Sequence, residues 1–144
     1  MKISIITATF NREATIVRAI TSIKKQTYEN IQNIVIDGAS EDKTISLVKP
    51  LLDHNDILIS EHDSGIYDAL NKGLSRASGD IIGFLHSDDL YSNNNVISKV
   101  IECFSNSDVD VVYGDITFFS GNNVKKIKRR YNYWDYLKVV QQID

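Results

Sequence analysis

The chain of 144 residues alternates short runs of β-branched residues with stretches whose apolar positions recur every three or four residues. Runs of the first kind predict buried strands, and the second kind predicts amphipathic helices. Strands that alternate with helices in this way are typical of βαβ units on a largely parallel sheet. We therefore predict an α/β fold with an open, mostly parallel, Rossmann-like sheet and flanking helices. The expected strands are 3–7, 34–36, 57–60, 81–85 and 109–113.

Helical periodicity fills the gaps between these strands. We expect the first helix to begin near Arg12, with Asn11 as its N-cap, and the second to follow a cap at Ser40 and to end or bend at Pro50. Further helical stripes run through 66–77 and 94–104, and the tail 133–140 is predicted to be helical. Two short runs, 116–119 and 124–127, joined through 120–123, predict a hairpin. No repeat, low-complexity segment or linker interrupts the chain, so 1–144 is expected to form one domain.

Composition narrows the class of protein. A net charge of −3, with 42% hydrophobic and 24% charged residues, is that of an ordinary globular protein and does not indicate a nucleic-acid partner. The single cysteine, Cys103, excludes an intramolecular disulfide and a thiolate metal cluster, which fits a cytoplasmic location. A peripheral position at the inner face of the membrane stays open. No stretch of the chain is long and apolar enough to cross a bilayer.

Polar side chains follow the expected strands at the point where each strand ends. Open parallel sheets bind ligands at this edge, where loops lead into helices whose N-termini favour anions. The candidate residues that follow the four strands in turn are Thr7, Thr9, Phe10 and Asn11; Asp37 and Gly38; Glu61, His62, Asp63 and Ser64; and His86, Ser87, Asp88 and Asp89.

Asp88 and Asp89 come directly after an apolar strand. Two neighbouring carboxylates at a strand end favour a hard cation such as Mn²⁺ or Mg²⁺, which completes its shell with water and phosphate oxygens. Such a cation would stabilise a departing diphosphate. The alternative is that the pair only caps the next helix or turn, a position that also favours aspartate.

Other candidates have a similar alternative. Asp37 follows an apolar strand and suits a contact with a base or ribose, but it also suits an Asx turn with Gly38. Thr7 and Thr9 fit either a binding edge or a strand, and Phe10 fits either a base or the core. Lys72, next to Asn71 on an expected helix, fits either a phosphate or solvent, and solvent is the usual environment of a lone lysine.

Four segments in this order carry a resemblance to a known family. The chain resembles the inverting family 2 glycosyltransferases with the GT-A fold, especially bacterial enzymes of cell-surface polysaccharide synthesis, from Ile3 to about Gly114. The four segments are 5–11 (IITATFN), 35–42 (VIDGASED), 63–73 (DSGIYDALNKG) and 77–89, which begins ASGD and ends FLHSDD.

The resemblance implies a role for each matching residue. Thr7, Thr9, Phe10, Asn11 and Ser87 would border the nucleoside, Asp37 would contact the base, and Asn71 and Lys72 would help to shape the donor pocket. Asp88, with Asp89, would correspond to the metal-binding part of the family's Asp-x-Asp motif. Here His86 stands where that motif often has Asp or Asn, which lowers the expected metal affinity or changes the ligands.

The function implied is transfer of a sugar from a nucleotide-diphosphate donor, with a uridine diphosphate sugar favoured, to a hydroxyl of a saccharide or lipid-linked saccharide, with inversion. The family's general base lies well after the Asp-x-Asp segment, so we expect it beyond residue 144 and expect this chain to hold the N-terminal, donor-binding part. Two alternatives stay open. A nucleotidyltransferase would need a glycine-rich phosphate loop after the first strand, where this chain has none. A non-catalytic nucleotide-binding or interaction domain would keep the fold without the chemistry.

Overall fold

The fold is that of a computed structural model, which describes residues 1–106, 108–120 and 123–131. It divides into two compact units, Met1–Ser98 and Lys99–Asp144. The expectation of one domain over 1–144 stays a prediction.

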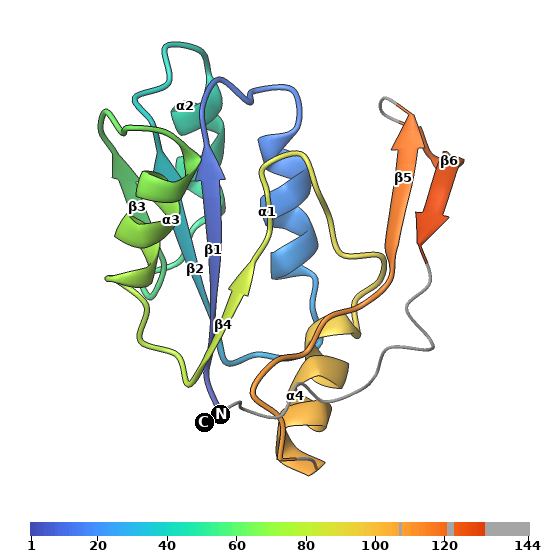
Figure 1. The fold of residues 1–144 in the computed structure, drawn as a ribbon. Coiled ribbons are helices and arrows are strands. Elements are labelled where there is room, and N and C mark those ends of the chain that lie inside the picture. Colours follow the sequence, from blue (N-terminus) through green and yellow to red (C-terminus); the bar gives the residue numbers. More distant parts are fainter. Residues whose placement is uncertain (107, 121–122, 132–144) are drawn as a thin grey trace. The chain divides into compact units, whose positions relative to one another are not determined.

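A parallel sheet of four strands forms the first unit (Figure 1). The strands are β1 (Ile3–Thr9), β2 (Ile31–Asp37), β3 (Ile57–Ser60) and β4 (Ile81–Phe84). Their order is β3-β2-β1-β4, and each pairs in parallel with its neighbours. Every residue of the central strand β1 is buried, as a strand covered on both faces requires. The open parallel sheet predicted from the sequence is therefore confirmed.

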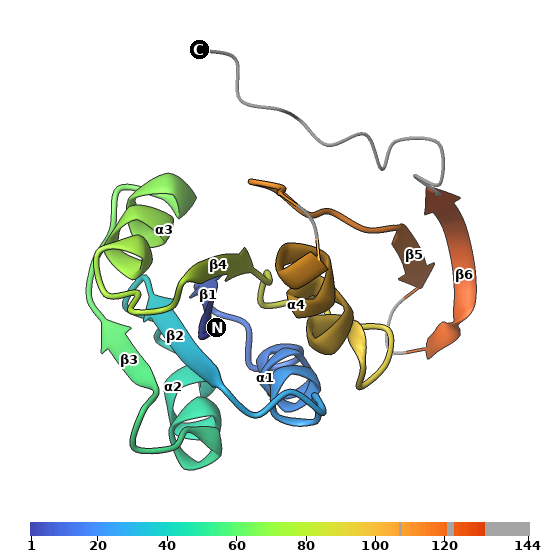
Figure 2. The ribbon, with the colours of Figure 1, turned by 90° about the horizontal axis from the view of Figure 1, so that it is seen from below.

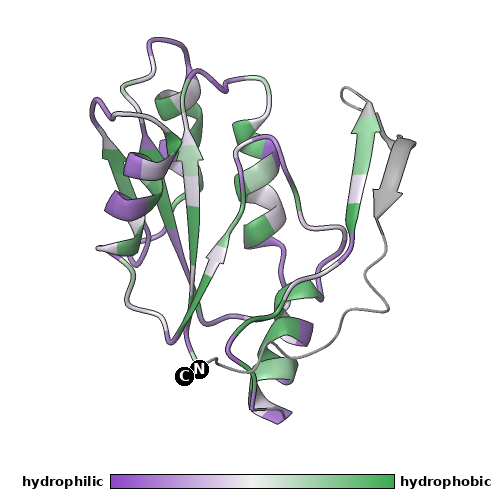
Figure 3. Cartoon of the chain, viewed as in Figure 1, coloured by the Kyte–Doolittle hydropathy of each residue, from purple (hydrophilic) through white to green (hydrophobic). Residues whose placement is uncertain are grey.

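Helices cover both faces of this sheet. Figure 2 shows α3 (Ile66–Leu74) on one face, and α1 (Ile16–Lys24) and α2 (Thr44–Val48) on the other. The 3₁₀ turn η1 (Lys49–Leu51) continues α2 and contains Pro50, the residue expected to end or bend this helix. Under α3 lies a core of buried residues from three elements: Ile6, Ala8, Ile34, Ile36 and Ala69. Figure 3 colours the chain by hydropathy, with hydrophobic residues in green.

A glycine sets the distance between α3 and the sheet. A Cβ atom on Gly73 would lie 2.4 Å from Cγ2 of Ile6, closer than any normal carbon–carbon contact. Helix α3 therefore packs directly over β1, and its N-terminus lies at the same edge as the carboxyl ends of the strands.

Two predicted helix starts are wrong. Helix α1 begins at Ile16, and Asn11 is not its N-cap but takes a left-handed φ of 49° in the preceding loop. Ser40 caps no helix, because its N–H and hydroxyl are hydrogen-bonded to Asp37 and α2 begins only at Thr44. In both cases the polar side chain makes its hydrogen bonds within or between these loops and not to the N–H groups of a helix end.

The second unit contains helix α4 (Val96–Asn106) from Lys99 onward and an antiparallel pair, β5 (Ile116–Ser120) and β6 (Asn123–Tyr131). The predicted hairpin is confirmed, with longer strands than expected. The strand predicted at 109–113 is wrong: these residues form no ladder with the described strands, and Val111 is 58% exposed. The predicted helix at 133–140 lies outside the described residues. Within 1–106, 108–120 and 123–131, no helix has the length and apolarity needed to span a bilayer.

Candidate functional site

A cleft of about 870 Å³ lies at the edge of the first unit where the parallel strands end. Because the four strands run in the same direction, the loops that follow them meet at one edge, and all four loops contribute to the lining. Helix α3 adds its first turns to the wall. The lining residues are Ala8, Thr9, Phe10, Asn11, Arg12, Gly38, Ala39, Glu41, His62, Asp63, Gly65, Ile66, Ala69, His86, Ser87 and Asp88.

Hydrogen bonds join the loops after β1 and β2 and hold one wall of the cleft. The Asn11 N–H donates to Oγ of Ser40 at 2.8 Å, and the Asn11 side-chain oxygen accepts from the N–H of Glu41 at 3.0 Å. The N–H of Arg12 donates to Oγ1 of Thr44 at 2.8 Å. The left-handed φ of Asn11 aims its backbone and side chain at the same neighbouring loop. This wall is therefore set by the protein itself before any ligand binds.

Asp37 stabilises the loop after β2, which forms part of the same wall. Its side chain is fully buried. One oxygen, Oδ2, accepts from the N–H of Ser40 at 2.8 Å and from the hydroxyl of Ser60 at 2.7 Å, and the other accepts from the hydroxyl of Ser40. Asp37 does not line the cleft. A base would have to reach a buried carboxylate that already accepts three hydrogen bonds.

Asp88 lies on the turn that follows β4. The N–H of Leu85 extends the pairing with β1 by donating to the carbonyl of Ile6, and the N–H of Asp89 donates to the carbonyl of His86 at 3.0 Å, which closes the turn. Asp88 is exposed and lines the cleft. Its carboxylate makes no hydrogen bond or ion pair with the part of the chain that the structure describes, so both oxygens are available to a ligand.

Asp89 is exposed beside Asp88 but does not line the cleft. Loss of hydration, and secondarily the neighbouring Asp88 carboxylate, raise the pKa of Asp89. Two adjacent carboxylates without a full countercharge favour a cation. No three His, Cys, Asp or Glu side chains of the described residues converge on one point. A cation that takes one or two carboxylates and completes its shell with water and phosphate fits this donor set.

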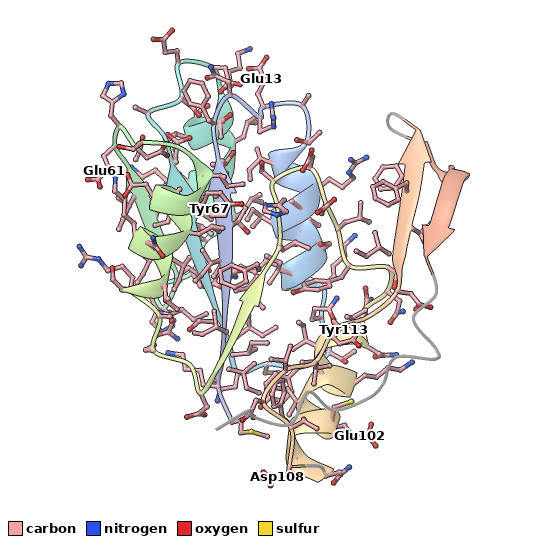
Figure 4. The ribbon with its side chains drawn as sticks, viewed as in Figure 1. Glu13, Glu61, Tyr67, Glu102, Asp108 and Tyr113 are labelled. Carbon is pink, nitrogen blue, oxygen red and sulfur yellow. The ribbon has the colours of Figure 1, made fainter. Side chains whose placement is uncertain are left out.

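Lys72 and Asn71 lie on α3, outside the cleft. The Lys72 ammonium donates to the carbonyl of His62 at 2.9 Å and pairs with Glu61 at 3.0 Å (Glu61 is labelled in Figure 4) and with Asp68 at 3.3 Å. These carboxylates, Glu61 first, raise the pKa of Lys72 above its usual value despite some loss of hydration. The lysine therefore ties the loop after β3 to α3, and the structure brings neither residue to the predicted donor pocket.

The residues at the end of β1 are divided between the core and the cleft. Thr7 is buried and does not line the cleft, whereas Thr9 is buried and does. The hydroxyl oxygens of both are buried and make no hydrogen bond within the described residues. Phe10 lines the cleft with 55% of its surface exposed, and Ser87 lines it although only 5% is exposed. Of the ten predicted site residues, the structure brings five to the cleft: Thr9, Phe10, Asn11, Ser87 and Asp88.

The cleft also contains residues outside those ten. Gly38, His62, Asp63 and His86 follow the ends of β2, β3 and β4, so the rule that places ligands at this edge already points to them. The sequence does not point to Arg12 and Glu41, because the hydrogen bonds between the loops after β1 and β2 cannot be read from it.

Comparison with known proteins agrees with this fold. The profile of the family described as "Glycosyl transferase family 2" matches residues 4–142. An uncharacterised glycosyltransferase of Mycobacterium tuberculosis is 38% identical over 104 residues, which cover 72% of this chain and 40% of that protein. The chain thus spans about 40% of the length of the curated relative that it matches.

Two solved structures share the fold. The crystal structure of S. aureus TarS 1–349 in complex with UDP-GlcNAc superposes with a TM-score of 0.66 at 25% identity, over 74% of this chain and 32% of that one. A mannosyltransferase from Pyrobaculum calidifontis in complex with GDP-Man and Mn²⁺ gives a TM-score of 0.68 at 25% identity, over 79% of this chain and 34% of that one.

Proposed function

This chain belongs to glycosyl transferase family 2, and we propose that its cleft binds the nucleoside diphosphate of a sugar donor together with a divalent cation at Asp88. One observation carries the proposal. The Asp88 carboxylate is exposed in a cleft of about 870 Å³ and makes no hydrogen bond or ion pair among the described residues. A carboxylate without such contacts, at the ligand-binding edge of a parallel sheet, is suited to bind a ligand.

Different residues of this chain would bind the nucleoside and the diphosphate of the donor. Phe10 and Asn11, after β1, border the part of the cleft suited to the nucleoside, and Asp88, with Asp89 beside it, holds the cation next to the diphosphate. Mn²⁺ or Mg²⁺ bound there would neutralise the charge that develops on the departing diphosphate. His86 also lines the cleft, two residues before Asp88.

The donor class rests on the relatives. TarS was crystallised with UDP-GlcNAc and the Pyrobaculum mannosyltransferase with GDP-Man and Mn²⁺. We favour a uridine diphosphate sugar, transferred with inversion to the hydroxyl of a saccharide or lipid-linked saccharide in surface polysaccharide synthesis. We assign donor binding to this chain and assign no residue in it as the general base that activates the acceptor hydroxyl.

Calorimetry tests the role of Asp88. With Mn²⁺ present, we expect a UDP-sugar to bind to the wild-type chain, and we expect chelation of Mn²⁺ or the change Asp88→Ala to weaken binding at least about tenfold, the usual scale for loss of a metal-site residue. Asp88→Ala should fold normally, because the side chain is exposed and makes no hydrogen bond with the described residues.

The control is Asp80→Ala, an exposed carboxylate just before the other end of the same strand, β4, where it accepts a hydrogen bond from the N–H of Lys2 at 2.7 Å. It should leave binding unchanged. Tight binding that is independent of Mn²⁺ and is the same in Asp88→Ala would rule out the proposed role of Asp88.

A further inference from the structure

Gly38 has no side chain, and two neighbouring side chains of the cleft approach its backbone closely. A Cβ atom at this position would lie 2.7 Å from Oδ2 of Asp63 and 3.5 Å from Cδ2 of Phe10. Gly38 does not have a positive φ, so glycine is needed here for space and not for backbone conformation. The three residues follow β1, β2 and β3, which are adjacent in the sheet. An aromatic ring and a carboxylate therefore both lie close to the backbone of Gly38.

Asp63 is held so that one oxygen stays available. Its Oδ1 accepts a hydrogen bond from the N–H of Gly65 at 2.9 Å, which fixes the orientation of the carboxylate. Its Oδ2, the atom next to Gly38, accepts no hydrogen bond from the residues that the structure describes. The side chain is half-buried and lines the cleft. This oxygen is therefore available to a hydrogen-bond donor of a ligand in the cleft.

We propose that Asp63, in the space opened by Gly38, accepts the ring N–H of the donor's nucleobase, while Phe10 lies against the face of the base. This assignment rests on the proposed function, since it places a nucleotide in the cleft. It gives Asp63 the base contact that the sequence alone assigned to Asp37, whose oxygens are already used by Ser40 and Ser60.

The chemistry predicts which bases fit. An ionised carboxylate only accepts hydrogen bonds. Uracil presents N3–H and guanine presents N1–H, whereas the matching ring nitrogens of cytosine and adenine carry lone pairs that would face the carboxylate. Cytosine and adenine could donate only from their exocyclic amino groups, which lie to one side of that position, so a carboxylate fixed opposite the ring nitrogen discriminates against them. Phe10 contributes stacking that all four bases share, so selectivity comes from Asp63.

Titration of four diphosphates in the presence of Mn²⁺ tests the assignment. The comparisons are UDP against CDP and GDP against ADP, so that each pair has one ring size and differs in the ring N–H. We expect the base that the cleft accepts to bind at least about tenfold tighter than its partner in the pair, since hydrogen bonds to charged groups are worth about 10- to 100-fold. The first pair identifies uracil as the natural base, and the second identifies guanine.

Three variants separate the contact from general effects. Asp63→Asn keeps an oxygen for the N–H of Gly65 but can offer an amide to the base, so it should weaken the preferred diphosphate about 10-fold or more and bring the ratio within its pair near one. Gly38→Ala should displace Oδ2 of Asp63 and lower the same ratio. Glu61→Gln, two residues from Asp63 and outside the cleft, removes the same charge and should leave both ratios unchanged.

The outcomes distinguish this inference from the proposed function. If Asp63→Asn leaves the ratio unchanged, or weakens both members of a pair equally, while binding still requires Asp88, then only the role of Asp63 is overturned. If the wild-type chain binds none of the four diphosphates, the proposed function and this assignment fail together.

Discussion

Replacement of Asp37 tests whether this carboxylate supports the cleft or contacts the ligand. In the structure it is fully buried and accepts three hydrogen bonds, two from Ser40 and one from Ser60. Asp37→Ala removes the acceptor and leaves two hydroxyls and one backbone N–H without it. Asp37→Asn keeps the shape and one accepting oxygen, while the hydroxyl of Ser40 can turn to accept from the new amide.

The size of the effect follows from these contacts. Hydrogen bonds to a charged acceptor contribute about 1.5–3 kcal/mol each. Three of them would exceed 4 kcal/mol, but the cost of burying the Asp37 charge in the wild type, and entry of water near the cleft in the variant, offset part of the sum. We expect Asp37→Ala to lower the free energy of unfolding by about 3–5 kcal/mol and Asp37→Asn by about 1–2 kcal/mol.

Equilibrium unfolding in urea measures both changes. The midpoint should fall with little change in the slope m, since the native fold is kept. Glu29→Ala, an exposed residue of the same unit, is the control and should stay within about 0.5 kcal/mol of the wild type. If Asp37→Ala is as stable as that control, the support role is wrong. If it is stable but loses nucleotide binding, Asp37 contacts the ligand directly.

Two further predictions concern α3. Gly73→Ala places a Cβ atom 2.4 Å from Ile6, so we expect a loss of about 1–2 kcal/mol in urea unfolding after the gain in helix propensity is counted, and unchanged or increased stability would contradict this packing. The N–H of Ser64, and secondarily Lys72, lower the pKa of Asp68 below 3.8 against some loss of hydration. Its stabilising effect is therefore complete above pH 3.8 and disappears as the pH falls through its folded pKa. The stability gap between the wild type and Asp68→Asn should shrink when urea midpoints are compared from pH 6 to pH 3, and a constant gap would refute the assignment.

The hydrophobic pattern predicted the parallel sheet but not the lengths of its strands. Strand β2 starts at Ile31, three residues earlier than expected, and its first polar residues, Gln32 and Asn33, are buried with hydrogen-bond partners in the fold. The side chain of Gln32 accepts a hydrogen bond from the hydroxyl of Ser4 at 2.7 Å, and the N–H of Asn33 donates to Asp56 at 2.8 Å. These partners are distant in the sequence, so periodicity alone could not show that polar residues were buried there.

At 109–113 the sequence predicted a strand where the structure has none. An apolar run predicts a buried strand, but a strand also needs a neighbour to pair with, and the described residues supply none for this segment. Whether a neighbour exists is a property of the whole fold and not of the run itself.

The sequence predicted the edge that carries the cleft, because parallel strands end on the same side. It could not predict which side chain at each strand end reaches the cleft. Asp37 ends β2 and is buried, while the next residue, Gly38, lines the cleft and leaves room for Asp63. Lys72 was a candidate for a phosphate, but it pairs with Glu61, in the loop after β3, and with Asp68, one turn earlier on α3. The contacts of Asp37 with Ser60 and of Gly38 with Asp63 join segments far apart in the chain, and periodicity does not show them.

A crystal structure of the chain with Mn²⁺ and UDP, or with GDP if the titrations select guanine, would show directly whether the cation binds at Asp88. We expect an anomalous Mn²⁺ peak beside the carboxylate of Asp88 and next to the diphosphate, with the base in contact with Phe10 and Asp63. A cation bound away from Asp88, or a nucleotide at the opposite edge of the sheet, would contradict the proposal.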